Sequence, residues 1–289
     1  MTPKQRLIAP FCFLLLAVCG GCRNAEQSTP TNTPQSAASP AAATPAPFAA
    51  LPQDAQILQT RTFTSPKQRT YTIQTVEDDR EVALRAQPAS REALAMTAAA
   101  AGSDKFNGTA RKAAKLSLAT TLLETFSDLP ALIASLAPEA TMKNHVPPIT
   151  TGANSNRVAE EKRNVRARVF LYAASKEDDN DFHLILGRAP GSTPAVYLTM
   201  ELSGLPPNNS AAFAKLKAAR DAFKAFFINN SLPGSKYDFY TPPIPVEIEG
   251  SLFFDINHVT GGRPGPASLR PKMPVVWEVH PISKLVFEP

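Results

Sequence analysis

Three short segments with apolar residues at every second position restrict the fold of this chain more than any other feature. They cover residues 165–172, 182–186 and 196–202, and an acidic stretch at 177–181 separates the first two. Alternation with a period of two is typical of strands that bury one face and expose the other. We therefore expect three successive strands at the start of a β-rich domain.

The elements after these strands complete a recognisable order. Residues 210–227 carry apolar side chains at helical spacing, and alternating segments return at 246–252 and 275–279. Three strands, a helix and two more strands follow one another in the same order as in the five-stranded OB barrel. The prediction is a mostly β C-terminal half, an OB-like barrel over residues 160–289 with one helix between strands 3 and 4.

Charged residues on two of the predicted strands provide a check on this order. In an OB barrel the first strand runs antiparallel to the fourth, so Arg166 and Arg168 should face Glu247 and Glu249. Gly250 within the fourth strand is expected at a bulge. We predict that these four charges form structural pairs.

The residues before the barrel are expected to form a small mixed α/β section over 53–150. Residues 70–76 and 81–84 alternate around a polar turn, which predicts a hairpin between residues 57 and 84. Helices are predicted at 90–101 and 125–137, and the Pro-rich and polar residues near 150 suggest a boundary.

The N-terminus has the pattern of an export signal. Lys4 and Arg6 precede an apolar run at 7–18, which is shorter than the about 20 residues that a membrane-spanning helix needs. The run ends in Cys19-Gly20-Gly21-Cys22, which resembles a bacterial lipoprotein signal over residues 1–22 with Cys22 as the lipidated residue. The pattern departs from that signal at Cys19, where leucine is usual, and an ordinary signal peptide remains the alternative.

The composition after this signal predicts a tether and a location. Residues 23–52 are rich in Pro, Ala, Ser and Thr, and we expect a disordered linker there. All three cysteines lie within the first 22 residues, so the mature chain can form no internal disulfide. We expect a protein of the bacterial cell envelope, anchored by its lipid in the outer membrane and facing the periplasm.

The charge balance favours no nucleic-acid partner. The formal net charge is only +5, and basic and acidic residues are nearly equal in number after residue 164. In an OB barrel the acidic loop at 174–181 would lie in the usual ligand surface and repel phosphates.

Three sequence blocks together carry a family resemblance. They are residues 177–184, 250–258 and 277–282. They resemble the ED-D-[YF]-H-L, G-x-x-FFD-x-x-H and E-L-H-P-V blocks of an uncharacterised family of exported bacterial proteins. The resemblance covers about residues 164–287, departs at 259–262, and implies no particular chemistry.

Candidate ligand-binding residues gather in or near these blocks. They are His183, Glu201, Asp255, His258, Arg263, Glu278 and His280. Imidazoles with carboxylates suit a transition metal such as zinc, with His183, His258 and His280 as its ligands. The other interpretation is that each histidine fixes a loop or a strand end through hydrogen bonds, and no cofactor is then expected.

The chain contains no catalytic motif. The predicted mature chain keeps no free thiol, and neither a nucleophile elbow nor a phosphate-binding glycine loop occurs. We therefore expect a binding or scaffold module, not an enzyme, with an envelope protein or saccharide as ligand. Its ligand surface would comprise strands 2 and 3 with the loops at 174–181 and 259–274. The alternative is a metal-dependent hydrolase that uses the His and carboxylate cluster, and a third possibility is a purely structural envelope protein with no small ligand.

Overall fold

The computed structural model describes residue 51 and residues 55–77, 103–227 and 232–289, which belong to one compact unit. The signal sequence, Cys22, the tether, the helix predicted at 90–101 and the strand predicted at 81–84 lie outside the described residues. In the described part, no helix is both long and apolar enough to span a membrane.

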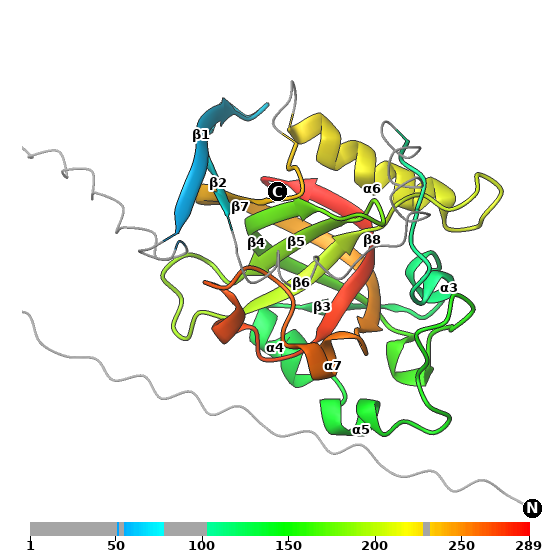
Figure 1. Ribbon diagram of the computed structural model, residues 1–289. Helices are drawn as coiled ribbons and strands as arrows, with labels where there is room; N and C mark the ends of the chain where they lie inside the picture. The colour runs from blue at the N-terminus through cyan, green and yellow to red at the C-terminus, as the bar shows by residue number, and fades with distance from the viewer. Residues whose placement is uncertain (1–50, 52–54, 78–102, 228–231) are drawn as a thin grey trace, which may run out of the picture. The chain divides into compact units, whose positions relative to one another are not determined.

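The described residues are mostly β, as predicted, and their strands form one sheet in the order β1-β2-β7-β8-β6-β5-β4-β3 (Figure 1). The strands are β1 (Gln56–Thr64), β2 (Thr70–Glu77), β3 (Leu123–Phe126), β4 (Asn164–Lys176), β5 (Phe182–Gly187), β6 (Tyr197–Leu202), β7 (Tyr237–Phe254) and β8 (Trp277–Phe287). The helices are α3 (Lys112–Lys115), α4 (Leu129–Ala134), α5 (Glu139–Lys143), α6 (Phe213–Phe226) and α7 (His258–Gly261), with 3₁₀ turns at Ala159–Glu161 and Arg270–Lys272.

Five of these strands have the pairing of an OB barrel. Strands β4, β5 and β6 form antiparallel pairs, β6 runs parallel to β8, and β7 pairs antiparallel with both β8 and β4. Helix α6 lies between β6 and β7 in the chain, as predicted. The β6–β8 side of the barrel is the weakest, since only Thr199↔Glu278 and Met200↔Val279 are paired there.

The core lies inside these five strands. Alternate residues point inward and are buried, among them Leu184, Met200, Leu252 and Val279. Helix α6 lies at one end of the barrel and α4, α5 and α7 at the other, and Phe223 of α6 packs into the same core (Figure 1). Each such side chain contributes roughly 1.5–3 kcal/mol when it leaves water.

The predicted charge pairs between the first and fourth barrel strands are confirmed. Arg166 faces Glu249 with an N–O distance of 2.6 Å, and Arg168 faces Glu247 at 3.0 Å. The register shifts at Gly250, where the predicted bulge lies. A Cβ at Gly250 would come within 2.6 Å of the Pro281 carbonyl oxygen, so β8 approaches β7 closely there.

The N-terminal section adds to the barrel sheet and is not separate from it. Strand β2 pairs with the preceding β1 and, on its other side, with residues 237–241 of β7. Pro242, Pro243 and Pro245 follow this first part of β7, which is why the strand was expected only from Val246. On the other side of the barrel, β3 pairs in parallel with β4.

The helix predicted at 125–137 is shorter than expected. Residues 123–126 form β3, and α4 begins only after Asp128. The Asp128 side chain accepts a hydrogen bond from the Leu129 N–H at 2.7 Å, and Pro130 occupies the first turn. Both features are typical of a helix start, so the chain changes from strand to helix at this point.

Candidate functional site

The outer face of β5, β6 and β8 carries a row of titratable side chains. His183, Glu201, Glu278 and His280 alternate with inward-pointing residues such as Leu184 and Met200. Side chains at alternate positions share one face of a sheet, so this outer face follows directly from the predicted alternation. All four side chains are buried.

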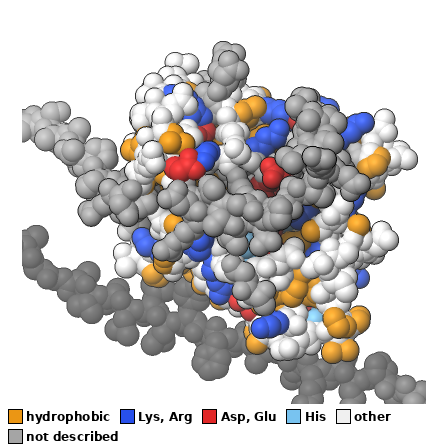
Figure 2. Space-filling view, viewed as in Figure 1, with side chains coloured by type: hydrophobic (Ala, Val, Ile, Leu, Met, Phe, Trp, Pro, Cys, Tyr) orange, Lys and Arg blue, Asp and Glu red, His pale blue; other side chains and the backbone are white. Residues whose placement is uncertain are grey.

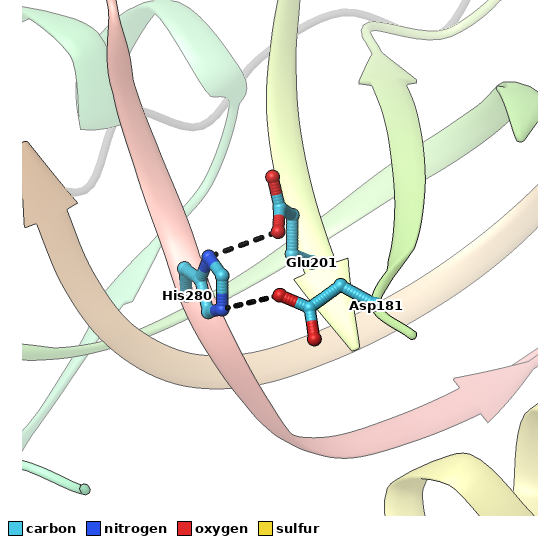
Figure 3. Close-up of side chains that lie close together, drawn as sticks. All are labelled: Asp181, Glu201 and His280. Atoms are coloured by element: carbon cyan, nitrogen blue, oxygen red, sulfur yellow. Dashed lines mark ion pairs between the residues drawn. The ribbon is translucent and has the colours of Figure 1, made fainter. Parts of the chain in front are cut away.

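His280 is the centre of this row (Figure 3). Its Nε2 atom lies 3.3 Å from Oδ2 of Asp181, while its Nδ1 atom lies 3.0 Å from Oε2 of Glu201 and 3.4 Å from Oε2 of Glu278. The ring is fully buried, with 0% exposure. Three carboxylates, one just before β5, one on β6 and one on β8, therefore surround one imidazole.

The buried charges shift one another's protonation. Burial alone would lower the pKa of His280, but the charge of Glu201 and the contacts to Asp181 and Glu278 raise it well above its usual value. Burial, together with the negative charge of Glu201, raises the pKa of Glu278 to about 8. The cluster thus contains one carboxyl group that holds its proton near neutral pH.

Lys115 brings a second cation to this face from α3. Its Nζ atom lies 3.0 Å from Oδ2 of Asp179 and 3.5 Å from Oδ2 of Asp181. Burial would lower the pKa of Lys115, but the charges of Asp179, Glu201 and Asp181 raise it well above its usual value. Burial and the charge of Asp181 raise the pKa of Asp179 to about 7.

The segment that carries Lys115 is fastened along this side of the barrel. The Phe106 N–H donates to the Leu205 carbonyl at 3.0 Å, and the Asn107 N–H donates to the Asp179 carbonyl at 2.9 Å. The Gly204 N–H donates to Oδ1 of Asp181 at 2.6 Å. These contacts enclose Asp181 completely, so at this residue the loop at 174–181 is not the open ligand surface that was expected.

His183 lies on the same face but has different partners. Its Nδ1 atom is 3.0 Å from Oε1 of Glu177 and 3.1 Å from the Tyr237 hydroxyl, and Nε2 is 3.3 Å from the Thr199 hydroxyl. These contacts connect β5 to β6 and β7. They agree with the interpretation of this histidine as a structural hydrogen-bonding group.

The remaining predicted site residues form separate contacts. His258 is hydrogen-bonded through Nδ1 to Asp255 at the end of β7. Arg263 forms an ion pair with Glu139 of α5. The predicted histidine triad is therefore not one ligand set, because within the described ranges only His280 belongs to a group that could hold a metal, together with Asp181 and Glu201.

Two members of the cluster were missing from the predicted set. Asp181 precedes β5 by one residue and shares the parity of His183, so the alternation could have identified it. Lys115 lies far from the barrel strands in the sequence, and only the folded chain brings it to Asp181.

No family model, curated protein or solved structure matches this chain. Its function must therefore be inferred from its residues and their contacts.

The loop at 259–274 covers part of the expected ligand surface. Leu269 and Met273 are buried in a second apolar cluster with Ile185, Tyr197 and Tyr237 on the outside of the barrel. Tyr172 packs edge-on against Tyr197 in the same cluster, with ring centroids 4.8 Å apart. The loop is thus a packed cover over this part of β5 and β6.

Two neighbouring hollows open on another part of the surface, on either side of residues 117–120. The larger has a volume of about 430 Å³ and the smaller about 320 Å³. The larger is lined by Leu116, Ser117, Leu118, Ala119, Thr120, Thr121, Asn164, Ser210, Ala211, Ala212 and Lys215, and the smaller by Ser117, Leu118, Ala119, Thr120, Asn156, Arg157 and Lys162. Neither lining contains a carboxylate.

Proposed function

We propose that this protein is a lipid-anchored binding module of the bacterial cell envelope that holds an acidic saccharide on its OB-like domain. The observation that carries the proposal is the pair of hollows beside residues 117–120, whose linings combine leucine and alanine side chains with hydroxyl, amide and cationic groups and contain no carboxylate. This surface replaces the face of β5 and β6 as the proposed ligand site, because the protein's own residues cover that face.

The lining of the hollows suits a saccharide that carries negative charge. Lys162 and Lys215 are exposed, and neither is paired with a carboxylate of the described residues. Ala211 and Ala212, just before α6, also line the larger hollow, and the dipole of a helix start favours negative charge. Because the hollows share residues 117–120, one elongated ligand with repeated units can occupy both.

The size of the larger hollow and the spread of basic residues on the visible face favour a small ligand. Figure 2 shows Lys and Arg side chains scattered over the visible face, without one dominant basic patch among the residues coloured by type. The larger hollow is within the usual range of about 300–1,000 Å³ for small-ligand sites. Recognition of a short saccharide segment therefore fits better than recognition of a nucleic acid, whose binding requires an extended basic surface.

The test is co-sedimentation of the purified chain with peptidoglycan sacculi, which are insoluble and carry carboxylates. We expect saturable binding that weakens with salt, and a loss of about 10-fold or more in Lys162→Glu/Lys215→Glu, because both reversals place carboxylates beside the ligand. Lys272→Glu is the matched control, since Lys272 is exposed but lines neither hollow. Equal binding by the double variant and the control would refute the site.

The proposed anchor has its own test at Cys22. We expect Cys22→Ser to move the protein from the membrane fraction to the soluble fraction, because lipidation requires the thiol. In the protein that retains Cys22, mass spectrometry of the N-terminal peptide should show the added mass of the lipid. A Cys22→Ser protein that stays in the membrane fraction would contradict lipid anchoring.

The competing proposal is a metal-dependent hydrolase. That chemistry needs a metal-bound water within reach of a substrate. Glu201, Glu278 and His280 are all buried. No observation of the described residues opens this cluster to a polymer, so the binding module is the function that we put forward.

A further inference from the structure

We infer that Asp181, Glu201 and His280 form a binding site for one divalent transition-metal ion, which ties β5, β6 and β8 together on the outside of the barrel. This inference is independent of the saccharide site, which lies elsewhere on the surface. The ion is structural, since its ligands are buried and its site adjoins the weakest side of the barrel.

The spacing of the ligand atoms is the first argument. One atom from each of the three side chains can be chosen so that all three lie within 4.8 Å of one another. Nε2 of His280 and Oδ2 of Asp181 are 3.3 Å apart. Two ligand atoms that each lie about 2.1 Å from one ion at a tetrahedral angle are about 3.4 Å apart, which matches this pair.

Two buried atoms without hydrogen bonds are the second, independent argument. Among the described residues, neither Nε2 of His280 nor Oε2 of Glu201 makes a hydrogen bond, although the first is completely buried and the second side chain nearly so. Oδ2 of Asp181 lies 3.3 Å from the first atom and Nδ1 of His280 lies 3.0 Å from the second, but neither contact is a hydrogen bond. Buried polar atoms are rarely left in this state unless a water or an ion satisfies them.

The orientation of the imidazole is the third argument. Nδ1 of His280 is hydrogen-bonded to Oε2 of Glu278 at 3.4 Å. A histidine ligand commonly donates its second ring N–H to a carboxylate, which fixes the tautomer and directs the other nitrogen at the ion. Glu278 therefore acts as the positioning residue on Nδ1, which also lies 3.0 Å from Oε2 of Glu201 without a hydrogen bond to it, and Nε2 of His280, on the side of Asp181, is left to bind.

The charge of the cluster favours a divalent cation. Four carboxyl groups, those of Asp179, Asp181, Glu201 and Glu278, lie around two cationic side chains, Lys115 and His280. Ionised carboxylates are costly to bury without a cation beside them, so a bound cation stabilises the ionised form of these groups. One nitrogen and two oxygen ligands suit zinc or manganese better than calcium, which prefers oxygen ligands alone.

The test uses the full chain, purified in detergent without chelator or nickel affinity, stripped of metal and titrated with zinc and with manganese. We expect one ion per chain by elemental analysis after dialysis, a higher Tm for the loaded protein, and zinc-edge X-ray absorption that shows one imidazole with oxygen ligands. No saturable binding of either ion, or a spectrum with several imidazoles, would overturn the site.

Variants locate the ion on the proposed residues. Asp181→Asn and Glu201→Gln should weaken zinc binding by at least about 100-fold, and Glu278→Gln by about 10–100-fold through its effect on the histidine. His183→Gln is the matched control, a buried histidine on the same face with other partners. Circular dichroism verifies folding, and unchanged binding in folded Asp181→Asn or Glu201→Gln would refute the assignment.

Discussion

At the scale of single residues, the largest stability effects should come from charges that the fold encloses. Glu161 is fully buried and accepts two hydrogen bonds from Arg111, at 2.7 and 2.9 Å. It also accepts from the backbone N–H groups of Phe254 and Val158, both at 2.8 Å. This one carboxylate connects residues 111–161 to the end of β7.

We therefore predict that Glu161→Ala destabilises the protein by about 3–5 kcal/mol, because it leaves the buried Arg111 charge unpaired. Urea denaturation gives the free energy of unfolding. The neighbouring Glu160→Ala is the control, since Glu160 is partly exposed and forms an ion pair with His145 at 3.3 Å. Glu160→Ala should lower the free energy of unfolding by less than about 1 kcal/mol. Equal losses in both variants would contradict this account.

The Asp255–His258 pair should make stability depend on pH. Burial would lower the His258 pKa, but the hydrogen bond and charge of Asp255 raise it above its usual value of 6.5. A group whose pKa is raised in the folded state stabilises the folded protein fully at pH values below its pKa in the unfolded chain. This stabilisation disappears as the pH rises through the pKa of the folded state. The pair therefore contributes most at mildly acidic pH.

We expect the difference in unfolding free energy between the native sequence and His258→Gln to be largest near pH 5.5 and to shrink toward pH 9. Chemical denaturation at a series of pH values measures this difference. For Asp255 the pKa is lowered by the contact with His258 against the effect of burial, so the contribution also fades toward strongly acidic pH. A difference that stays constant from pH 5.5 to 9 would show that the pair does not titrate as inferred.

At the scale of the elements, the close approach of β7 and β8 depends on a missing side chain. A Cβ at Gly250 would lie 2.5 Å from Cγ1 of Val279 and 2.6 Å from the Pro281 carbonyl oxygen. The Pro281 oxygen belongs to the backbone and cannot turn away, so β8 would have to move. The neighbouring strand thus requires a glycine at position 250.

Gly250→Ala should lower the free energy of unfolding by about 1–3 kcal/mol, because the added methyl group overpacks the contact between β7 and β8. Gly152→Ala is the matched control, because nothing lies within 4 Å of its added Cβ. It should change stability by less than about 0.5 kcal/mol. Thermal and urea unfolding of both variants provide the comparison, and a neutral Gly250→Ala would mean that β8 shifts at little cost.

At the scale of the whole molecule, Glu288 fastens the β1–β2 hairpin to the barrel. Its carboxylate accepts hydrogen bonds from the Ser65 hydroxyl at 3.0 and 3.1 Å and from the Tyr71 hydroxyl at 2.6 Å. Its backbone N–H donates to the Pro245 carbonyl at 2.7 Å. A residue at the end of β8 thereby holds both the hairpin and β7.

Glu288→Ala should speed amide exchange in residues 56–77 by about 10-fold or more, since each hydrogen bond to a charged group contributes about 1.5–3 kcal/mol. Exchange in β5 and β6 should change little. Glu247→Ala is the control, because Glu247 pairs with exposed Arg168 on the outer surface. Uniformly faster exchange along the chain would indicate global destabilisation and contradict the local role.

The local sequence pattern was sufficient to predict most of the barrel strands and part of the candidate site. Alternation and helical spacing identified β4, β5, β6, β8 and α6, because each buries one continuous face. The same alternation placed Glu201, Glu278 and His280 on one outer face. The pairing of Arg166 with Glu249 followed from strand order alone.

The sequence determined this protein's β-rich barrel, since burying apolar faces of period two leaves few alternatives. Only the tertiary structure decided which charges meet: it brought Lys115 and Asp181 to His280, separated His183 and His258 from them, and laid residues 259–274 over β5. The physical reason is that alternation specifies the face on which a side chain lies. Its partners come from distant segments, whose positions depend on packing of the whole chain.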